Sequence, residues 1–493
     1  MRRQALRTEF GMLGALTRRQ LLRLIAAGGA ALARPAWPQG SDRPRLGGRI
    51  VLRNDADYET WRASMVWHWS KPQRFPEAIV QARSVDDVQA AVRYAARNAR
   101  QVSLRSSGHN GSCVSLRDRA VLIDTSALRR VQMAADGDSA WVGPGTTSRE
   151  LLDALAKAGR IFPAAHCATV AMGGYVLGGG MGWNGDQFGG MACHNLLGAR
   201  IVTAEGEKLE VDEQRHPDWM YALRGAGSGM FAAVSELRLR TFAAPAVIGN
   251  AMLVYPSAEA PGVVRRLRER ALSGPANTEA VMLLLHAPTK GEAMAADRFV
   301  CVVQLFAYAA DESQARSALQ HYTGSSLRRG ASMVVDYQST SIARMYSPQN
   351  TELDYGRYAV DNFWSDDPEA AVQVFLARLA TVPAPRGHVL YTVKRNTDLQ
   401  GNACLSRMAN DYFACYLVWD HLRDDADNRR WLRETMKKLQ PHTTGRYINE
   451  IDELAQSERV TDCYSPEAWR RLRELRKRYD PQERFCDYLG LSA

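Results

Sequence analysis

One short loop of the sequence combines small polar residues with groups that can react. Residues 105–113, with the sequence RSSGHNGSC, place the imidazole of His109 and the thiol of Cys113 among serine, glycine and asparagine. Residues of these types do not build a hydrophobic core, and they allow backbone N–H groups to approach an anion closely. The loop is therefore predicted to wrap around an anionic ligand.

A second stretch is rich in glycine. Residues 166–184 have the sequence HCATVAMGGYVLGGGMGWN. Glycine-rich segments are typical of flexible linkers, but a solvated linker would avoid the valine, leucine, methionine, tyrosine and tryptophan found here. Close packing of the backbone against a flat or charged ligand is the better interpretation.

Three histidine–cysteine pairs raise the question of a metal site. They lack the C-x₂₋₄-C and H-x₃₋₅-H spacing of structural zinc sites, so no metal ion is predicted. The pairs are His109/Cys113, His166/Cys167 and Cys193/His194. Two other cysteines, Cys301 and Cys415, lie within apolar runs and are predicted to be buried thiols.

The elements that position the first loop follow from hydrophobic periodicity. A predicted strand over residues 78–83 is followed by a helix over 84–99, which Ser84 and Asp87 begin in a capping-box arrangement. A second predicted strand over 101–105 leads directly into the loop. This order predicts an α/β unit that presents the loop at the end of a strand.

The length of 493 residues predicts two domains rather than one. Residues 49–244 form the first domain in this prediction. From residue 245 strands alternate with helices, which predicts a second, α+β domain that extends to residue 435. Residues 436–493 are expected to return to the first domain.

Residues 1–33 have the features of an export signal. The pair Arg18-Arg19 precedes a short apolar region that ends in small residues, a pattern that resembles the twin-arginine signal. We expect export of the folded protein to the periplasm or the exterior; an arginine-rich arm is the alternative. Residues 34–48 are predicted to be a linker, and no later stretch is long and apolar enough to span a membrane.

The net charge is +10 at pH 7, but residues 1–33 contain six arginines and one glutamate and so account for half of it. The remaining excess is mild and does not indicate a nucleic acid partner. The most basic stretch, residues 469–479, carries Trp469, Leu472, Leu475 and Tyr479 on one helical face. It is predicted to be an amphipathic surface helix with solvated arginines.

Five motifs together resemble a known family. RSSGHN, CATVAMGGYVLGGGMG, HNLLGARIVTAEGE, ALRGAGSGMF and YINEID with KRYDPQERF occur in the order found in berberine bridge enzyme-like flavoproteins. These belong to the vanillyl-alcohol oxidase/p-cresol methylhydroxylase superfamily and include glucooligosaccharide oxidases. The resemblance runs from about Tyr58 to Phe485. It implies an α+β fold class: a two-domain PCMH-type FAD-binding fold whose substrate domain is an antiparallel sheet covered by helices.

The resemblance also implies where FAD binds. In the family the first loop surrounds the FAD pyrophosphate, its histidine is joined to the flavin 8α-methyl, and in a subset a cysteine is joined to flavin C6. These tethers correspond to His109 and Cys167; a loop-stabilising histidine and an unattached thiol are the alternatives. Val170 corresponds to a position associated with oxygen access. The other residues expected at FAD are Arg105, Ser106, Ser107, Gly108, Asn110, Thr169, Gly173, Gly174, Gly178, Gly179, Asn195 and Val202.

The family carries Tyr-x-Asn-Tyr or Tyr-x-Asn-His near the C-terminus, with the last residue facing the flavin, and residues 447–450 here are YINE. Partial burial raises the pKa of a carboxyl group, so Glu450 is expected to act as the base, with Tyr447 beside it. A carboxylate would also suit a substrate with a cationic group. A shifted alignment that leaves Glu450 exposed is the alternative. Tyr358 and Asp361 are further expected partners.

The expected function is an exported oxidase that transfers hydride from an alcohol or hemiacetal to covalently bound FAD, which O₂ reoxidises with release of H₂O₂. Sugars and phenolic or natural-product alcohols are the expected small-molecule substrates. Two alternatives remain: a dehydrogenase that passes electrons to a periplasmic carrier, and a flavin-carrying binding protein that has lost its base.

Overall fold

The computed structural model describes residues 43–286, 299–347, 356–384, 386–395, 402–453 and 457–489. The predicted export signal, residues 1–33, and most of the predicted linker lie outside the described residues. The described residues from Pro44 onward form one compact unit, in which three main sheets are present. Within the described residues, no helix has the length and apolar character needed to cross a membrane.

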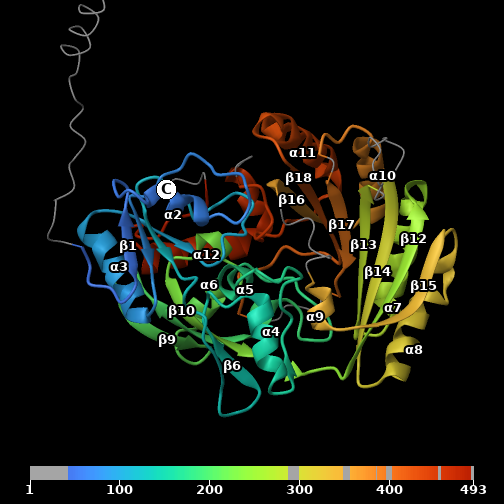
Figure 1. Cartoon of the computed structure of the whole chain (residues 1–493), viewed down its shortest axis with the longest axis horizontal. Coiled ribbons are helices and arrows are strands. Elements are labelled where there is room, and N and C mark those ends of the chain that lie inside the picture. Colours follow the sequence, from blue (N-terminus) through green and yellow to red (C-terminus); the bar gives the residue numbers. More distant parts are fainter. Residues whose placement is uncertain are drawn as a thin grey trace, which may run out of the picture. The chain divides into compact units, whose positions relative to one another are not determined.

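The first sheet presents the polar loop (Figure 1). Its strands, in spatial order, are β1 (Arg49–Leu52), β2 (Ala78–Gln81), β4 (Val121–Asp124) and β3 (Val102–Arg105). Strands β2, β4 and β3 are parallel, and β1 is antiparallel to β2. Helices α2 (Tyr58–Ser64) and α3 (Val85–Arg97) lie in the same part of the chain as this sheet. The Ser84 side chain accepts a hydrogen bond from the Asp87 N–H, so α3 begins where the sequence predicts.

The second sheet is antiparallel throughout. Its strands, in spatial order, are β5 (Val131–Met133), β6 (Ser139–Val142), β10 (Ala233–Arg240), β8 (Leu196–Val202) and β9 (Lys208–Asp212). A two-stranded sheet pairs β7 (Arg160–Ile161) with β11 (Phe242–Ala243). The helices of this region are α4 (Ser148–Ala156), α5 (Met172–Leu177) and α6 (Pro217–Leu223). Helix α5 falls within the glycine-rich stretch.

The third sheet has seven antiparallel strands and lies on the right of Figure 1. Their spatial order is β15 (Met333–Thr340), β12 (Val247–Pro256), β14 (Phe299–Ala309), β13 (Thr278–His286), β17 (His388–Val393), β18 (Asp411–Trp419) and β16 (Arg357–Ser365). Its helices are α7 (Ala260–Ser273), α8 (Glu312–Thr323), α9 (Ile342–Met345), α10 (Pro368–Leu379) and α11 (Asp425–Leu439). Four of them, α7, α8, α10 and α11, share one hydrophobic core with the sheet. This is the antiparallel, helix-covered sheet that the resemblance implies.

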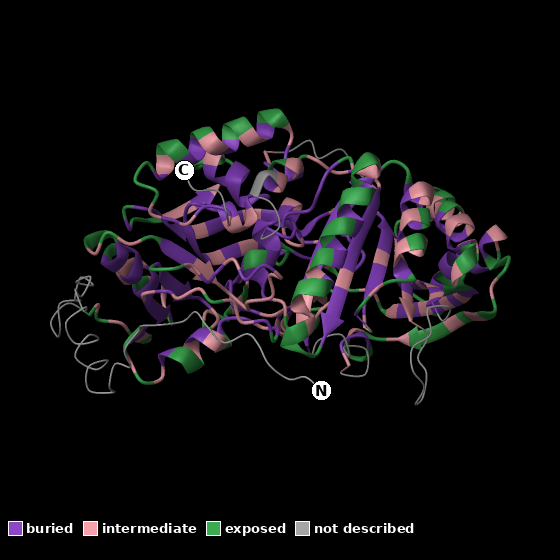
Figure 2. Cartoon of the chain, turned by 90° about the horizontal axis from the view of Figure 1, so that it is seen from above, coloured by how far each residue is buried: buried purple, intermediate pink, exposed green. Residues whose placement is uncertain are grey.

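The sequence of strand β18 is almost continuously apolar, and the surroundings of the strand explain why. Phe413, Cys415 and Leu417 belong to the core beneath the helices, whereas Tyr412 and Tyr416 alternate with them and face the other side. Figure 2 shows buried strands under helices whose outer faces are exposed. Because both faces of the strand are covered, no polar-alternating pattern is required. Cys415 and Cys301 are buried, as predicted.

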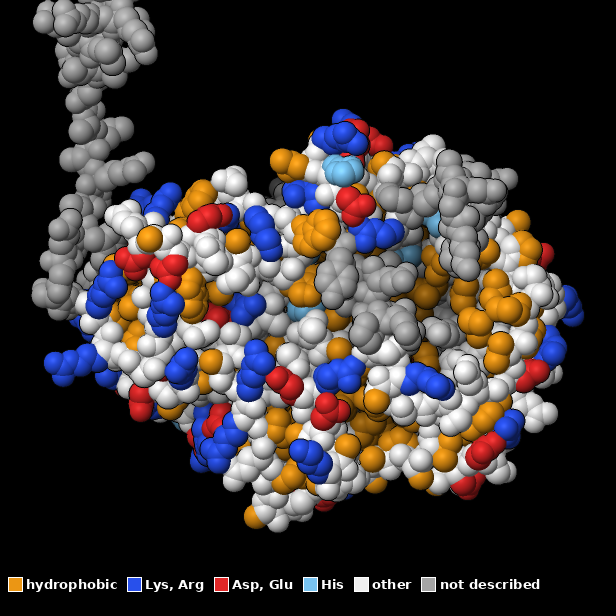
Figure 3. Space-filling view, in the orientation of Figure 1, with side chains coloured by type: hydrophobic (Ala, Val, Ile, Leu, Met, Phe, Trp, Pro, Cys, Tyr) orange, Lys and Arg blue, Asp and Glu red, His pale blue; other side chains and the backbone are white. Residues whose placement is uncertain are grey.

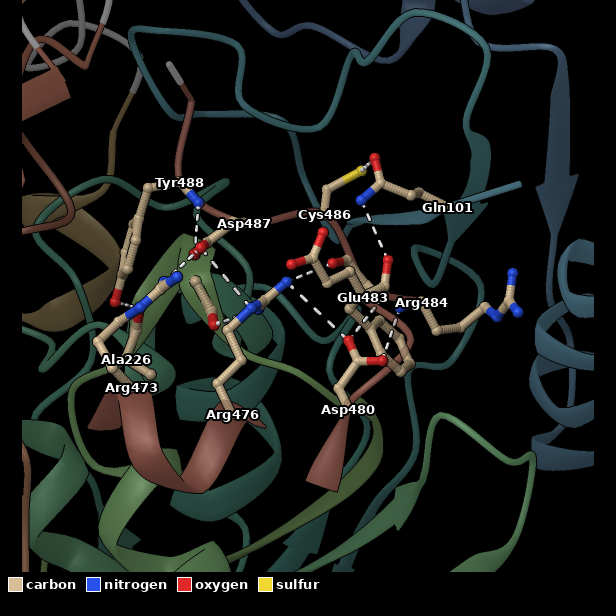
Figure 4. Close-up of polar contacts among 12 residues, drawn as sticks. Gln101, Ala226, Arg473, Arg476, Asp480, Glu483, Arg484, Cys486, Asp487 and Tyr488 are labelled. Carbon is tan, nitrogen blue, oxygen red and sulfur yellow. Dashed lines mark hydrogen bonds and ion pairs between the residues drawn. The ribbon is translucent and has the colours of Figure 1, made fainter. Parts of the chain in front are cut away.

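The last segment of the chain packs against the beginning of the first sheet. Helix α12 (Pro466–Tyr479) is followed by a turn in which the Asp480 carboxylate accepts the N–H groups of Arg484 and Phe485, at 2.6 and 2.9 Å (Figure 4). Phe485 then forms a parallel bridge with Val102 of β3. The C-terminal segment therefore supports the strand from which the polar loop leaves.

Charged side chains of both signs are interspersed on the face shown in Figure 3. Several arginines are paired rather than only solvated: on α12, Arg471 and Arg478 both contact Asp218, and Arg476 is buried beside Asp480. The predicted amphipathic helix is present, but its basic face is partly used in packing.

Candidate active site

A cavity of about 480 Å³ lies where three parts of the chain meet. The first is the polar loop after β3, and the second is the glycine-rich stretch around α5. The third wall combines strands β16 to β18 with residues 447–450. Thirteen of the residues predicted at the site line this cavity: Arg105, Ser106, Ser107, Gly108, His109, Asn110, Cys167, Val170, Gly173, Gly174, Tyr358, Tyr447 and Glu450.

The backbone of the polar loop presents unpaired donors. Within the described part of the chain, the N–H groups of residues 106–111 make no hydrogen bond to protein. Gly108 has φ +76°, and a Cβ there would lie 2.2 Å from the Met65 carbonyl oxygen, so only glycine fits. Arg105 pairs with Asp124 at 2.9 Å and donates to the Ser107 carbonyl at 3.1 Å, which fixes the start of the loop. A row of free backbone donors is suited to a phosphate group.

The glycines of the second stretch serve two different purposes. A Cβ at Gly173 would lie 2.4 Å from Ser106 Oγ, and one at Gly178 would lie 1.9 Å from Asn449 Oδ1, so these glycines allow protein segments to pack closely. A Cβ at Gly174 would meet nothing within 4 Å, so this position faces open space beside the cavity. Gly179, at φ +120°, packs against the Tyr447 ring and does not line the cavity. The predicted close approach to a ligand therefore applies to part of the stretch.

The two predicted tethers are connected through one hydroxyl. Thr169 Oγ1 lies 2.9 Å from Nε2 of His109 and 3.4 Å from Sγ of Cys167. The His109 ring stacks on Trp67 with centroids 4.4 Å apart. Burial, together with the nearby charge of Arg105, lowers the pKa of His109 to about 3, so its imidazole is neutral.

The other thiol of the loop is in a different environment. Cys113 Sγ lies 3.3 Å from Nε2 of His68, on the buried side of the loop. Burial raises the pKa of Cys113 to about 11, which keeps it as an unreactive thiol.

Glu450 lies at the cavity between two phenols. Tyr412 donates a hydrogen bond to Oε2 of Glu450, and Tyr416 also bonds to this carboxylate. Burial raises the pKa of Glu450, and the two tyrosine hydrogen bonds partly offset that effect. The alternative of a simply exposed Glu450 does not hold. A titratable carboxylate with a raised pKa is suited to proton transfer.

Tyr447 has a supporting position. Its hydroxyl accepts the N–H groups of Gly180 and Met181, at 2.9 and 3.2 Å, and so holds the glycine-rich stretch. The side chain of Asn362 in β16 holds the Tyr447 backbone with two hydrogen bonds. Its Oδ1 accepts the Tyr447 N–H at 2.7 Å, and its Nδ2 donates to the Tyr447 carbonyl at 2.9 Å.

Six of the predicted residues do not line the cavity: Thr169, Gly178, Gly179, Asp361, Asn195 and Val202. Asp361 is buried on the opposite face of β16, where it pairs with Arg459 at 2.7 Å and faces Arg446 at 3.7 Å. Asn195 is buried and donates to the Phe188 carbonyl at 2.8 Å, which closes a turn. Val202 is buried in β8. By contrast, Tyr358 lines the cavity, with its ring edge-on to Trp67.

Sequence reasoning missed the residues that orient the predicted ones: Trp67, Asn362, Tyr412 and Tyr416. Tyr412 and Tyr416 are four apart in a strand and therefore share a face, which was a usable signal. No local sequence pattern indicated that Trp67 or Asn362 would lie at the site. Among the described residues, no group of three or more His, Cys, Asp or Glu side chains is arranged to hold a metal ion.

Comparisons with known proteins agree with this site. Residues 76–212 match the family model described as an FAD binding domain. An FAD-linked oxidoreductase of Hypoxylon pulicicidum is 27% identical over 432 residues, which cover 87% of this chain and 94% of that protein. A glucooligosaccharide oxidase of Sarocladium strictum is 29% identical over 223 residues, 44% of each chain.

Among solved structures, BBE-like 1 of Physcomitrella patens has a TM-score of 0.76 and 19% identity, covering 91% of this chain and 98% of that chain. The fold and the cofactor loop thus define an FAD-linked oxidoreductase. Within that class, the chain has the fold of the BBE-like proteins and resembles FAD-linked oxidoreductases and a glucooligosaccharide oxidase in sequence. The comparisons bear out the expected resemblance, the fold class and the FAD cofactor.

Proposed function

We propose that this protein is an exported oxidase that removes a hydride and a proton from an alcohol or hemiacetal and uses O₂ as electron acceptor, releasing H₂O₂. The observation that carries the proposal is the position of Glu450. Its carboxylate lies in the same cavity as the cofactor loop, and burial raises its pKa.

The residues present fit FAD. The unpaired N–H groups of residues 106–111 suit its pyrophosphate, and the open face at Gly174 leaves room for a flat ring. Bound FAD supplies a hydride acceptor at its flavin ring. In this proposal His109 and Cys167 attach it covalently, because both line the cavity and the Thr169 hydroxyl lies between them.

The chain's own task is to position the substrate and to take its hydroxyl proton. Glu450 accepts that proton in the ionised form, and its hydrogen bonds from Tyr412 and Tyr416 hold the carboxylate in place. Tyr447, whose hydroxyl is engaged by the glycine-rich stretch, acts as a positioning residue.

The substrate wall is formed by the free face of the large sheet. Tyr358, His388, Leu390 and Tyr416 line it. Aromatic rings with hydroxyl groups are suited to stack on a sugar or phenolic ring and to hydrogen-bond its hydroxyls. The glucooligosaccharide oxidase relative supports a carbohydrate among these classes.

Export by the twin-arginine route is part of the proposal. It rests on Arg18-Arg19 and the short apolar segment that follows them. Changing both arginines to lysine in the natural host should leave the protein in the cytoplasm, and secretion of this variant at the normal level would argue against the route.

The central experiment uses the purified protein with its flavin. A panel of sugars, oligosaccharides and phenolic alcohols is tested for bleaching of the flavin spectrum without oxygen and for H₂O₂ formation in air. The proposal expects both with at least one member of the panel. Bleaching without H₂O₂, with fast turnover on an artificial dye acceptor, would instead identify a dehydrogenase. A flavin that no member of the panel reduces would contradict the proposal.

A further inference from the structure

A histidine at the cavity is held by a buried carboxylate from the large sheet. Nε2 of His166 lies 2.7 Å from Oε1 of Glu279, a residue of β13 that is 113 positions away in the sequence. The His166 side chain is 39% exposed and lines the cavity, whereas that of Glu279 is 2% exposed. No part of the mechanism above uses this pair.

Glu279 is an anion inside the protein. Burial alone would raise its pKa, but His166, Lys394 and the Asn184 N–H together lower the pKa to about 2. The Asn184 N–H lies 2.8 Å from Oε2, and Lys394 Nζ lies 3.5 Å from Oε1. A carboxylate held ionised by these contacts is a hydrogen-bond acceptor only.

The pairing determines which nitrogen of His166 carries the proton. Since Glu279 can only accept, Nε2 must donate, and neutral His166 therefore has its lone pair on Nδ1. Among the described residues Nδ1 has no hydrogen-bond partner. The Trp183 ring contacts the imidazole edge-on, with centroids 4.3 Å apart, and further limits its rotation. A carboxylate that orients an imidazole also stabilises its protonated form.

Charged groups surround the pair on several elements. Lys394, after β17, and Asp186, whose pKa is raised by burial, lie on the side of Glu279. On the cavity side, Glu450, Arg105 and Arg117 line the cavity with His166, and positive charge on His166 lowers the pKa of Glu450. His166 and Glu450 thus line one cavity and interact electrostatically.

We propose that His166, oriented by Glu279, is a proton-relay residue that receives at Nδ1 the proton which Glu450 removes from the substrate hydroxyl. The inference rests on the proposed function. The substrate O–H bond breaks and Glu450 gains the proton; the proton then passes to Nδ1, which leaves Glu450 ionised and gives an imidazolium paired with Glu279. The exposed part of His166 releases the proton to water. Glu279 is a positioning residue in this scheme.

The first test examines the pair itself, in the flavin-loaded protein labelled with ¹⁵N-histidine. The histidine signal that is absent from the NMR spectrum of His166→Gln is assigned to His166. We expect an Nε2–H tautomer in wild type and a detectable share of the Nδ1–H tautomer in Glu279→Gln, because glutamine keeps the shape but its amide can also donate a hydrogen bond. The control variant is His321→Gln. In the wild type, Nε2 of His321 is also hydrogen-bonded, to the Arg270 carbonyl on the outer helices, so this substitution should leave the His166 signal unchanged. An Nδ1–H tautomer in wild type, or a tautomer population that Glu279→Gln leaves unchanged, would overturn the proposal.

The second test examines turnover with a substrate of the wild-type enzyme. His166→Gln and Glu279→Gln should lower kcat by about tenfold or more with little change in KM. His166→Gln also removes the positive charge that lowers the pKa of Glu450, so it should move the acidic limb of the kcat profile to higher pH. Free imidazole should partly restore kcat in His166→Ala, which a purely structural role would not allow. Wild-type kcat and pH profile in His166→Gln would overturn the relay.

The outcomes also separate the two proposals. If wild-type protein oxidises alcohols and Glu450→Gln does not, but both pair variants behave as wild type, the relay fails and the proposed function stands. If no alcohol reduces the flavin, the proposed function fails. The relay then has no substrate proton to carry, whatever the tautomer measurement shows. Melting temperatures of both variants, compared with wild type, identify any loss of folding.

Discussion

The hydroxyl oxygen of Thr169 lies 2.9 Å from Nε2 of His109, and the same oxygen is 3.4 Å from Sγ of Cys167. Two residues that are far apart in the sequence are thereby brought to one end of the cavity. Burial and the nearby Arg105 lower the pKa of His109 to about 3, so its imidazole is neutral and one ring nitrogen carries no proton. This arrangement leads to the first prediction.

His109→Ala and Cys167→Ala should each retain one covalent bond to FAD, and the double variant should retain none. Intact mass and the yellow colour of the acid-precipitated protein measure this directly. The matched control is Cys113→Ala, because the Cys113 thiol faces His68 and should not be joined to flavin. Full attachment in the double variant would show that other residues hold the cofactor.

Glu450→Gln should lower kcat by about 10²- to 10⁴-fold, the usual contribution of a positioned general base. The base works when ionised, so activity should rise with pH through the raised pKa of Glu450. Tyr412→Phe and Tyr416→Phe each remove a hydrogen bond that lowers this pKa, so each should shift the acidic limb further to higher pH. Glu453→Gln, a buried carboxyl outside the cavity, should leave the acidic limb in place.

Gly173→Ala and Gly174→Ala should have opposite effects. The first places a Cβ 2.4 Å from Ser106 Oγ and should destabilise the protein, because Pro144 also crowds the position. The second places a Cβ in open space at the cavity, so the melting temperature of the apoprotein should be unchanged or higher while flavin content falls. Equal flavin content in Gly174→Ala and wild type would show that the ring does not lie on this face.

The protein should lose stability in acid partly through Glu279. Its pKa in the folded state is about 2, below the usual value of 4.5, so its contribution to stability is complete above about pH 4.5 and disappears as the pH falls towards 2. The difference corresponds to roughly 3 kcal/mol. Unfolding free energies of Glu279→Gln should therefore depend less steeply on pH in this window than those of wild type. Glu467→Gln, on the exposed side of α12, should follow the wild-type curve.

Asp361→Asn should destabilise the protein rather than act on chemistry. Removal of this carboxylate leaves Arg446 and Arg459 without their buried partner, a change that costs about 3–5 kcal/mol in such pairs. Urea unfolding measures the loss, and kcat of the remaining folded enzyme should change little. A large fall in kcat with unchanged stability would show that Asp361 acts in the reaction.

The sequence by itself determined the local features of this protein. The Ser84 cap, the strand that ends at Arg105 and the small polar loop that follows it depend on neighbouring residues, and they formed where predicted. Glu450 was expected at the site from the resemblance of residues 447–450 to the family motif, and it lines the cavity.

Only the tertiary structure decided which side chains meet. Tyr358 and Asp361 are three apart in β16, so the alternation of a strand sends them to opposite faces, and the pairing of that strand decides which face meets the cofactor loop. The contact between His166 and Glu279 joins the glycine-rich stretch to β13, across 113 residues. Such contacts depend on sheet order and register, which are set by the packing of distant segments and leave no local trace in the sequence.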